Sequence, residues 1–272
     1  MTPAHWLTLH AAILEAIGNP EVSAVVVSHG TDTLEETAFF LDLTLKTSKP
    51  IILVGAQRNA SEADSDGARN LLNALTLAVA SEAQNKGVLV VMNEMIHAAR
   101  HVEKSHTTRV DGFSSGEAGS LGSVTLGKVV FFGTPIAQQT IPLQRNTMPT
   151  VVIVAMYAGA DGSLIDAAAL SGAQGIVIQG LGCGNVNQEM FTAIQRVIAQ
   201  GVTVVIATRV PNGVVVPIYG FMGGGATLKH AGAIIAQNLS PQKARVLLML
   251  ALQSTSDSTE IARHFDNSGV GN

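Results

Sequence analysis

The sequence predicts an α/β protein with two domains. Short apolar runs rich in valine and isoleucine alternate with amphipathic segments in both halves, which is the pattern of strands and helices around a parallel sheet. Glycine accounts for 27 of the 272 residues, and this content suits the tight turns that join such strands to helices. The length is that of about two domains. We therefore expect a parallel-sheet N-terminal domain and a smaller α/β C-terminal domain.

Three prolines mark a stretch without periodicity between the two halves. Pro135, Pro142 and Pro149 are spaced along it, and no helical or strand pattern crosses it. The predicted parts are an N-terminal domain at residues 1–133, a linker at 134–149 and a C-terminal domain at 150–272.

Composition and charge exclude several classes of protein. With 47% hydrophobic and 13% charged residues, the chain is far from a disordered composition. The net charge of −4 indicates no basic surface, so we expect no nucleic-acid or membrane partner. The apolar runs are much shorter than the roughly 18 residues of a membrane span. The single cysteine, Cys183, excludes an intrachain disulfide, and no signal peptide is visible, so we expect a cytoplasmic protein.

The chain begins with a predicted helix over residues 1–18. Thr2 is a suitable N-cap, Pro3 suits the first helical position and Gly18 ends the pattern. A strand over 22–27 follows and ends in a polar turn. The next helix begins at once, and Thr33 with Glu36 three residues later fits a capping box.

Further elements follow from the same patterns. Residues 97–127 are polar and rich in glycine, which predicts a loop region that carries Lys104. The other N-terminal elements are expected at 50–56, 87–92 and 128–132 for strands and at 66–79 for a helix. The C-terminal domain is expected to have strands at 150–155, 175–179 and 202–207 and helices near 163–171, 186–200, 241–252 and 258–265.

The polar turn at the end of strand 22–27 is the candidate functional site. Gly30 allows close backbone approach, and Thr31 and Asp32 follow at the carboxyl end of the strand, beside the start of a helix. Open α/β sheets bind small ligands at this edge, and helix N-termini favour anions. A small molecule with a carboxylate would suit the site. The alternative is that Thr31 and Asp32 only cap the helix, which is the commoner role of such residues.

Three other motifs give weaker signals. Residues 180–185, Gly-Leu-Gly-Cys-Gly-Asn, join a strand to a helix, but their glycines are out of phase with a dinucleotide-binding turn. Residues 219–225 lack the Lys-Ser/Thr ending of a phosphate-binding loop. His97 and His101 would share one face of a helix, as zinc ligands can, but no third ligand has suitable spacing, so surface or interface histidines are expected. We expect no metal and no cofactor.

Six segments resemble the bacterial L-asparaginase and glutaminase-asparaginase family. The sequence His-Gly-Thr-Asp-Thr-Leu-Glu-Glu-Thr-Ala at 29–38 is similar to the second signature motif of that family. The other similar segments, in the same order as in the family, are Val-Gly-Ala-Gln-Arg at 54–58, Asp-Gly-Ala-Arg-Asn-Leu at 66–71, Val-Val-Met-Asn at 90–93, Lys-Ser-His-Thr at 104–107 and Pro-Gln-Lys-Ala-Arg at 241–245.

The resemblance implies an amidohydrolase that converts L-asparagine and water to L-aspartate and ammonia, with L-glutamine as the other candidate substrate. It implies a catalytic group of Thr31, Asp32 and Lys104. In such a group the threonine hydroxyl bonds to the reacting centre or its water, the aspartate binds the α-amino group of the substrate, and the lysine tunes both. Gly30, Thr31 and Asp32 would form the substrate-binding turn.

The chain also departs from the family. The resemblance implies a flavodoxin-like N-terminal domain whose first strand, with the nucleophilic threonine of a Gly-Gly-Thr motif, has no counterpart in residues 1–272. We therefore expect impaired activity from this truncated family member and exposed apolar surface where the strand is missing. The alternative is a non-catalytic protein that binds small molecules or partners. A nucleotide-dependent enzyme that uses residues 180–185 is the least favoured alternative.

The family resemblance further implies a homo-oligomer, either a dimer or a tetramer. In the family the turn equivalent to 180–185 offers an asparagine to the active site of a neighbouring subunit, and Cys183 occupies that position here. A periplasmic location would follow if a signal peptide preceded residue 1.

Overall fold

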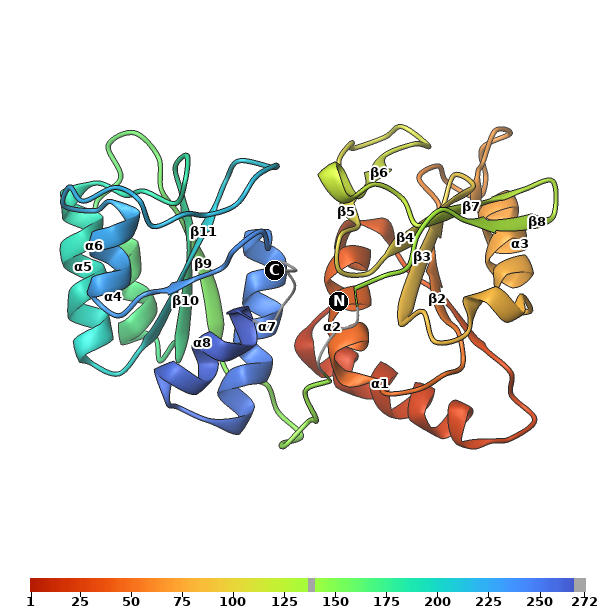
Figure 1. Ribbon diagram of the computed structural model, residues 1–272, viewed down its shortest axis with the longest axis horizontal. Coiled ribbons are helices and arrows are strands. Elements are labelled where there is room, and N and C mark those ends of the chain that lie inside the picture. Colours follow the sequence, from red (N-terminus) through yellow and green to blue (C-terminus); the bar gives the residue numbers. More distant parts are fainter. Residues whose placement is uncertain (137–139, 267–272) are drawn as a thin grey trace. The chain divides into compact units, whose positions relative to one another are not determined.

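The computed structural model describes residues 1–136 and 140–266. The chain divides into two units, Met1–Pro142 and Leu143–Asn272, and each is built around its own sheet (Figure 1). The predicted α/β class is confirmed. The boundary between the units, after Pro142, lies within residues 134–149, which were expected to be a linker. The bounds of that linker remain a prediction. In the part of the chain that is described, no helix has the length and apolar character that a membrane crossing requires.

A six-stranded sheet organises the first unit, with strands in the order β1-β2-β3-β4-β7-β8. Strands β1 to β3 are parallel, as predicted, whereas β4, β7 and β8 are antiparallel to their neighbours. The elements are α1 (Pro3–Gly18), β1 (Val25–Ser28), a 3-10 turn (Thr31–Thr33), α2 (Leu34–Thr44), β2 (Ile51–Val54), α3 (Gly67–Ala78), a 3-10 turn (Ser81–Ala83), β3 (Val88–Met92), β4 (Met95–Ala98), β5 (Glu103–Lys104), β6 (Phe113–Ser114), a 3-10 turn (Gly116–Ala118), β7 (Gly122–Thr125) and β8 (Lys128–Phe131).

The prediction of a loop over residues 97–127 was wrong in part. This stretch contains the end of β4 and all of β5, β6 and β7. The turn from β3 to β4 is made by Asn93 and Glu94, both at positive φ, which is the geometry of a tight hairpin. Leu126 and Gly127 make the same kind of turn between β7 and β8. Because only one of these four residues is glycine, the usual signal for a hairpin turn is weak in the sequence.

The prediction that His97 and His101 share one face of a helix was also wrong. His97 lies in β4 rather than on a helix, and only 4% of its surface is exposed, so it is not a surface residue. Its Nδ1 is 2.8 Å from the Ser115 hydroxyl. Within residues 1–136 and 140–266, no group of three or more His, Cys, Asp or Glu side chains could hold a metal ion.

Helix α1 begins where the sequence predicted, and helix α2 contributes many of the buried side chains of the first unit. Thr2 is the N-cap of α1 and accepts a hydrogen bond from the His5 amide. Helix α2 is almost entirely buried and fills the space beside the sheet with Phe39 and Phe40. A hydrogen bond joins α2 to the start of β3, where the Asp42 carboxylate accepts the backbone N–H of Val88 at 2.8 Å.

Strand β1 lies at the edge of the sheet, where it pairs with β2 alone among the described strands. Although Val25, Val26 and Val27 are apolar, each is only half-buried, whereas every residue of β2 is buried. The neighbouring helix α3 also exposes large apolar side chains, namely Leu71, Leu72, Leu75 and, at its C-cap, Val79. Parallel strands normally have both faces and both edges covered, so this side of the unit is incompletely covered.

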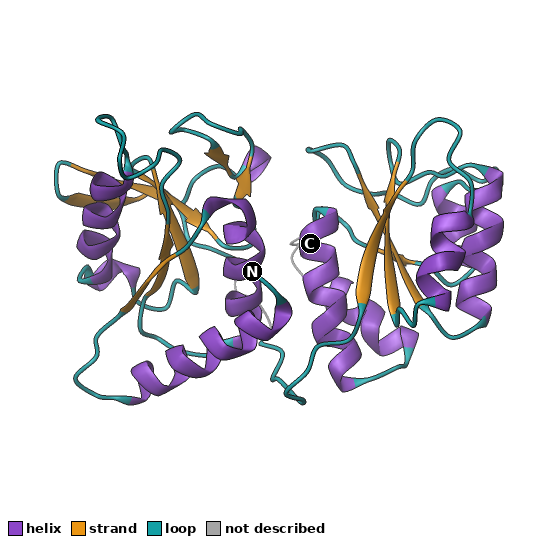
Figure 2. Ribbon diagram, turned by 180° about the vertical axis from the view of Figure 1, so that it is seen from behind, coloured by secondary structure: helices purple, strands orange, loops and turns teal. Residues whose placement is uncertain are grey.

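The second unit has a four-stranded parallel sheet in the order β12-β11-β10-β9. Helices cover both of its faces (Figure 2). The elements are β9 (Val151–Ala155), α4 (Ser163–Leu170), β10 (Gly175–Gly180), α5 (Gln188–Ala199), β11 (Thr203–Thr208), α6 (Gly225–His230), β12 (Ile234–Ile235), α7 (Pro241–Ser254) and α8 (Ser258–Asp266). All predicted elements are present. Only α6 and β12 were missed, because they are too short to show a period.

Candidate active site

Lys104 joins the two predicted catalytic residues of the turn after β1. Its Nζ donates to Thr31 Oγ1 at 2.9 Å and to Asp32 Oδ1 at 2.6 Å. Thr31 and Asp32 lie in the 3-10 turn between β1 and α2, and Lys104 ends β5, more than seventy residues further along the chain. The three residues expected to act together therefore lie within hydrogen-bonding distance.

The short β5–β6 hairpin that carries Lys104 is fixed by two side chains. Glu35, in the first turn of α2, accepts the Lys104 amide at 2.5 Å. The side-chain amide of Gln57 donates from Nε2 to the Arg109 carbonyl at 3.0 Å, and Arg109 lies in the loop between β5 and β6. A Cβ at Gly112 would lie 2.2 Å from Gln57 Nε2, so a glycine is required for this close approach. These contacts hold the lysine over the turn.

The charges of the group are unequally exposed. The Lys104 side chain is 18% exposed, whereas that of Asp32 is 91% exposed. The hydrogen bond and the positive charge of Lys104 hold the pKa of the Asp32 carboxyl below its ordinary value. Because Asp32 is so exposed, the ion pair contributes little to stability. Its effect is to keep an accessible carboxylate ionised beside a hydroxyl group.

A chain of hydrogen bonds, buried at its Trp6 end and exposed at its Gly30 end, supports the turn. Trp6 of α1 donates its indole N–H to Thr37 Oγ1 at 2.9 Å, and Thr37 lies 3.0 Å from His29 Nε2. His29 Nδ1 lies 2.6 Å from the Gly30 carbonyl. The same Thr37 hydroxyl is 3.1 Å from the Thr33 carbonyl. The side chain of Thr33 makes no capping bond, so the predicted capping box at Thr33 was wrong.

Two hydrogen-bond donors in this network follow from their partners, since both partners are carbonyl oxygens. A carbonyl oxygen only accepts, so the short contact with Gly30 requires the proton on His29 Nδ1. The single proton of the Thr37 hydroxyl is donated to the Thr33 carbonyl, while its oxygen accepts the Trp6 indole N–H and lies 3.0 Å from His29 Nε2. Trp6 is thereby linked to the residue that precedes Thr31, and sequence reasoning gave no signal for this link.

A second network ties the ends of β2 and β3 together. The Asp66 carboxylate accepts hydrogen bonds from the backbone N–H of Gln57 at 3.0 Å and from the side-chain amide of Asn70 at 2.9 Å. Asn70, which is 1% exposed, also accepts the Asn93 amide at 3.0 Å. Asp66 is the N-cap residue of α3 but makes no capping bond with its side chain. It instead orders the loop that contains Gln57, a role that sequence reasoning missed.

A cavity of about 370 Å³ opens beside the turn, at the carboxyl ends of β1 and β2. Its lining includes His29, Gly30, Gly55 and Leu71. A Cβ at Gly55 would lie 2.8 Å from the His29 carbonyl, so a glycine at 55 allows β2 to approach the turn. A Cβ at Gly30 would meet nothing within 4 Å, which leaves open space at the predicted substrate-binding position.

The two glycine-rich turns of the second unit are joined to each other. Leu181 and Asn185 form an isolated β-bridge, and Asn185 Oδ1 accepts the Gly225 amide at 3.2 Å. A Cβ at Gly184 would lie 2.6 Å from Val215, so this turn is packed rather than open. Cys183 is a free thiol within it.

Two family models match the chain. The model described as Asparaginase, N-terminal matches residues 1–137, and that described as Glutaminase/Asparaginase C-terminal domain matches residues 150–265. The chain belongs to the asparaginase family. By family it is an asparaginase-type enzyme, as the motifs predicted.

Individual asparaginases are similar over most of the chain. L-asparaginase 2 of Bacillus subtilis is 38% identical over 96% of this chain and 68% of its own length. The probable periplasmic L-asparaginase of Haemophilus influenzae is 39% identical, over 96% of this chain and 74% of that protein. A crystal structure of the probable cytoplasmic L-asparaginase from Campylobacter jejuni has a TM-score of 0.92 and 38% identity, covering 98% of this chain and 84% of that one.

Replacing Lys104 by Met should raise the pKa of Asp32 toward its ordinary value, because the hydrogen bond and charge that favour the carboxylate are lost. A depressed pKa means that the contact favours the folded protein above the ordinary pKa of aspartate. The contribution is lost as the pH falls through the folded-state pKa. Carboxyl ¹³C NMR titration measures this shift. Lys128→Met, on the exposed strand β8, is the control, and an identical Asp32 titration in both variants would contradict the assignment.

Replacing Thr37 by Val should weaken the fold by about 1–3 kcal/mol, because it leaves the Trp6 indole without its buried acceptor. Urea denaturation measures the change, and Trp6, the only tryptophan, also reports it by fluorescence. Thr76→Val is the control, since the Thr76 hydroxyl bonds only to the Leu72 carbonyl on an exposed part of α3. Equal free energies of unfolding for the two variants would argue against the network.

Proposed function

We propose that Thr31, Asp32 and Lys104 form the catalytic group of an amidohydrolase that converts L-asparagine and water to L-aspartate and ammonia. The observation that carries this proposal is the pair of hydrogen bonds from the Lys104 ammonium to Thr31 and Asp32. The family match and the names of similar proteins support the substrate class. L-glutamine is the alternative substrate.

Each residue has a distinct role in the proposed reaction. The exposed, ionised Asp32 accepts hydrogen bonds from the α-ammonium group of the substrate. The Thr31 hydroxyl bonds to the reacting carbonyl group or to the attacking water. Lys104, 2.9 Å from that hydroxyl oxygen, stabilises negative charge that develops on it. Gly30 leaves space for the substrate backbone. The reaction requires no metal and no cofactor.

Acyl transfer through a threonine ester also needs a nucleophile that attacks the amide carbon. In the proposed mechanism the first nucleophile is a threonine of a separate strand, and residues 1–272 contain no such Gly-Gly-Thr motif. The half-buried edge strand β1 and the exposed apolar side of α3 support the idea that a further strand belongs beside them. We therefore propose that the polypeptide of residues 1–272, taken alone, has impaired activity.

The alternative function is binding without turnover. The cavity of about 370 Å³ beside Gly30, together with an ionised Asp32, would retain a small molecule even without a first nucleophile. A non-catalytic binding protein and an impaired enzyme would share the same residues, and turnover distinguishes them. The proposed compartment is the cytoplasm, with the periplasm as the alternative.

Ammonia release from L-asparagine tests the function. We expect residues 1–272 to release ammonia no faster than their own Thr31→Ala variant. A version extended upstream with a Gly-Gly-Thr strand should be active, and Thr31→Ala or Lys104→Ala in it should lower kcat by about 100-fold or more. Thr76→Ala and Lys128→Ala are matched controls at exposed positions.

The outcomes separate the proposals. Activity of residues 1–272 that disappears in Thr31→Ala would overturn the impairment and make Thr31 itself the nucleophile. An inactive extended protein that still binds L-asparagine through Asp32 would favour the binding protein.

We also propose that the chain forms a homo-oligomer, either a dimer or a tetramer. Large apolar side chains between β11 and α6 are exposed: Ile218 at 64%, Phe221 at 52% and Met222 at 53%. A group of large exposed apolar side chains within five residues of the chain is typical of an interface. The double variant Ile218→Ser/Phe221→Ser should shift the protein toward monomer in sedimentation velocity. Leu170→Ser, at the end of α4 and 88% exposed, should have no effect, and a monomeric parent protein would refute the proposal.

A further inference from the structure

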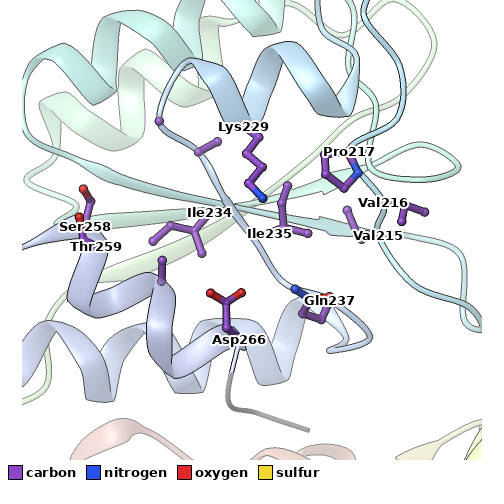
Figure 3. A pocket seen from close by; sticks show the side chains of 13 residues that line it. Val215, Val216, Pro217, Lys229, Ile234, Ile235, Gln237, Ser258, Thr259 and Asp266 are labelled. Atoms are coloured by element: carbon purple, nitrogen blue, oxygen red, sulfur yellow. The ribbon is translucent and has the colours of Figure 1, made fainter. Parts of the chain in front are cut away.

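A second cavity, of about 340 Å³, lies wholly within the second unit (Figure 3). It is bounded by the segment after β11, the end of α6, strand β12 and helix α8. Its apolar side is formed by Val215, Ile234 and Ile235, which are 1%, 6% and 8% exposed. These buried side chains form an apolar surface on one side of the cavity.

Two opposite charges face this cavity from different elements. Lys229 extends from α6 and Asp266 from the end of α8, and their charged ends point toward the space between them (Figure 3). Within the described residues, neither charged group takes part in a hydrogen bond or ion pair. Both residues are exposed, so an ammonium group and a carboxylate group lie at the solvent-exposed side of the same cavity.

The backbone is unfavourable at one lining residue. Gln237 has φ of 58°, a left-handed conformation that is uncommon for a residue other than glycine. Backbone strain of this kind is often found at positions that serve a ligand.

We propose that this cavity binds a free α-amino acid with an aliphatic side chain. The ligand carboxylate would bind Lys229, its ammonium group would bind Asp266, and its side chain would lie on the apolar surface that includes Val215 and Ile234. A zwitterion is favoured over a simple anion or cation because residues 1–136 and 140–266 offer no partner to either charge. The volume lies within the range of small-molecule sites. All of these residues are in the second unit, so the proposal does not depend on the proposed catalysis.

Isothermal titration calorimetry with L-leucine tests this site on the purified chain. We expect saturable binding that is weakened by about tenfold in Lys229→Ala and in Asp266→Asn, because each variant removes one charged hydrogen bond. Arg209→Ala and Glu260→Gln are matched controls, since they change the same charges at exposed positions of the same unit outside the cavity. Both controls should bind L-leucine as the parent does.

Two analogues assign each charge to its partner. N-acetyl-L-leucine lacks the ammonium group, so Asp266→Asn should not weaken its binding further. L-leucine methyl ester lacks the carboxylate, so Lys229→Ala should not weaken its binding further. The site is refuted if L-leucine shows no saturable binding, if N-acetyl-L-leucine binds the parent as tightly as L-leucine, or if the control variants weaken binding equally.

Discussion

The contact of one lysine with a distant turn is the constraint on which the candidate active site depends. Lys104 reaches Thr31 and Asp32 only because its hairpin is held by Glu35 from α2 and by Gln57 from the segment after β2. Asp66 in turn fixes the backbone of Gln57. A two-residue strand such as β5 has little stability of its own. The position of the ammonium group is therefore determined by side chains from three other segments.

The parallel parts of the fold follow closely from the sequence, because buried parallel strands are continuous apolar runs. Ile51–Val54 and Val88–Met92 show this directly, with every residue buried. In the antiparallel half of the first sheet, β8 was expected at 128–132, but β4 and β7 could not be predicted in the same way. β7 alternates buried and partly exposed residues over only four positions, and the turn before β4 uses Asn93 and Glu94 instead of glycine.

Some residues of the candidate site could be predicted from the sequence, and others could not. Thr31 and Asp32 follow an apolar strand, so their position at its carboxyl end could be predicted, and the family resemblance added Lys104. The residues that hold this group gave no local signal. Thr37 looks like an ordinary helical threonine, and Asn70 like an exposed amide, until the fold brings Trp6 and Asn93 against them. Hydrogen bonds between residues distant in sequence depend on tertiary structure, and one sequence does not encode them as a pattern.

Strand β1 presents an unpaired edge among the described strands. Its outer backbone groups, flanked by valines that are only half-buried, can accept a further strand. Nothing in β1 itself opposes such pairing, since it contains no proline, no lysine and no other charged residue. When residues 1–272 are expressed by themselves, another copy can therefore pair at this edge, and such self-association rises with protein concentration.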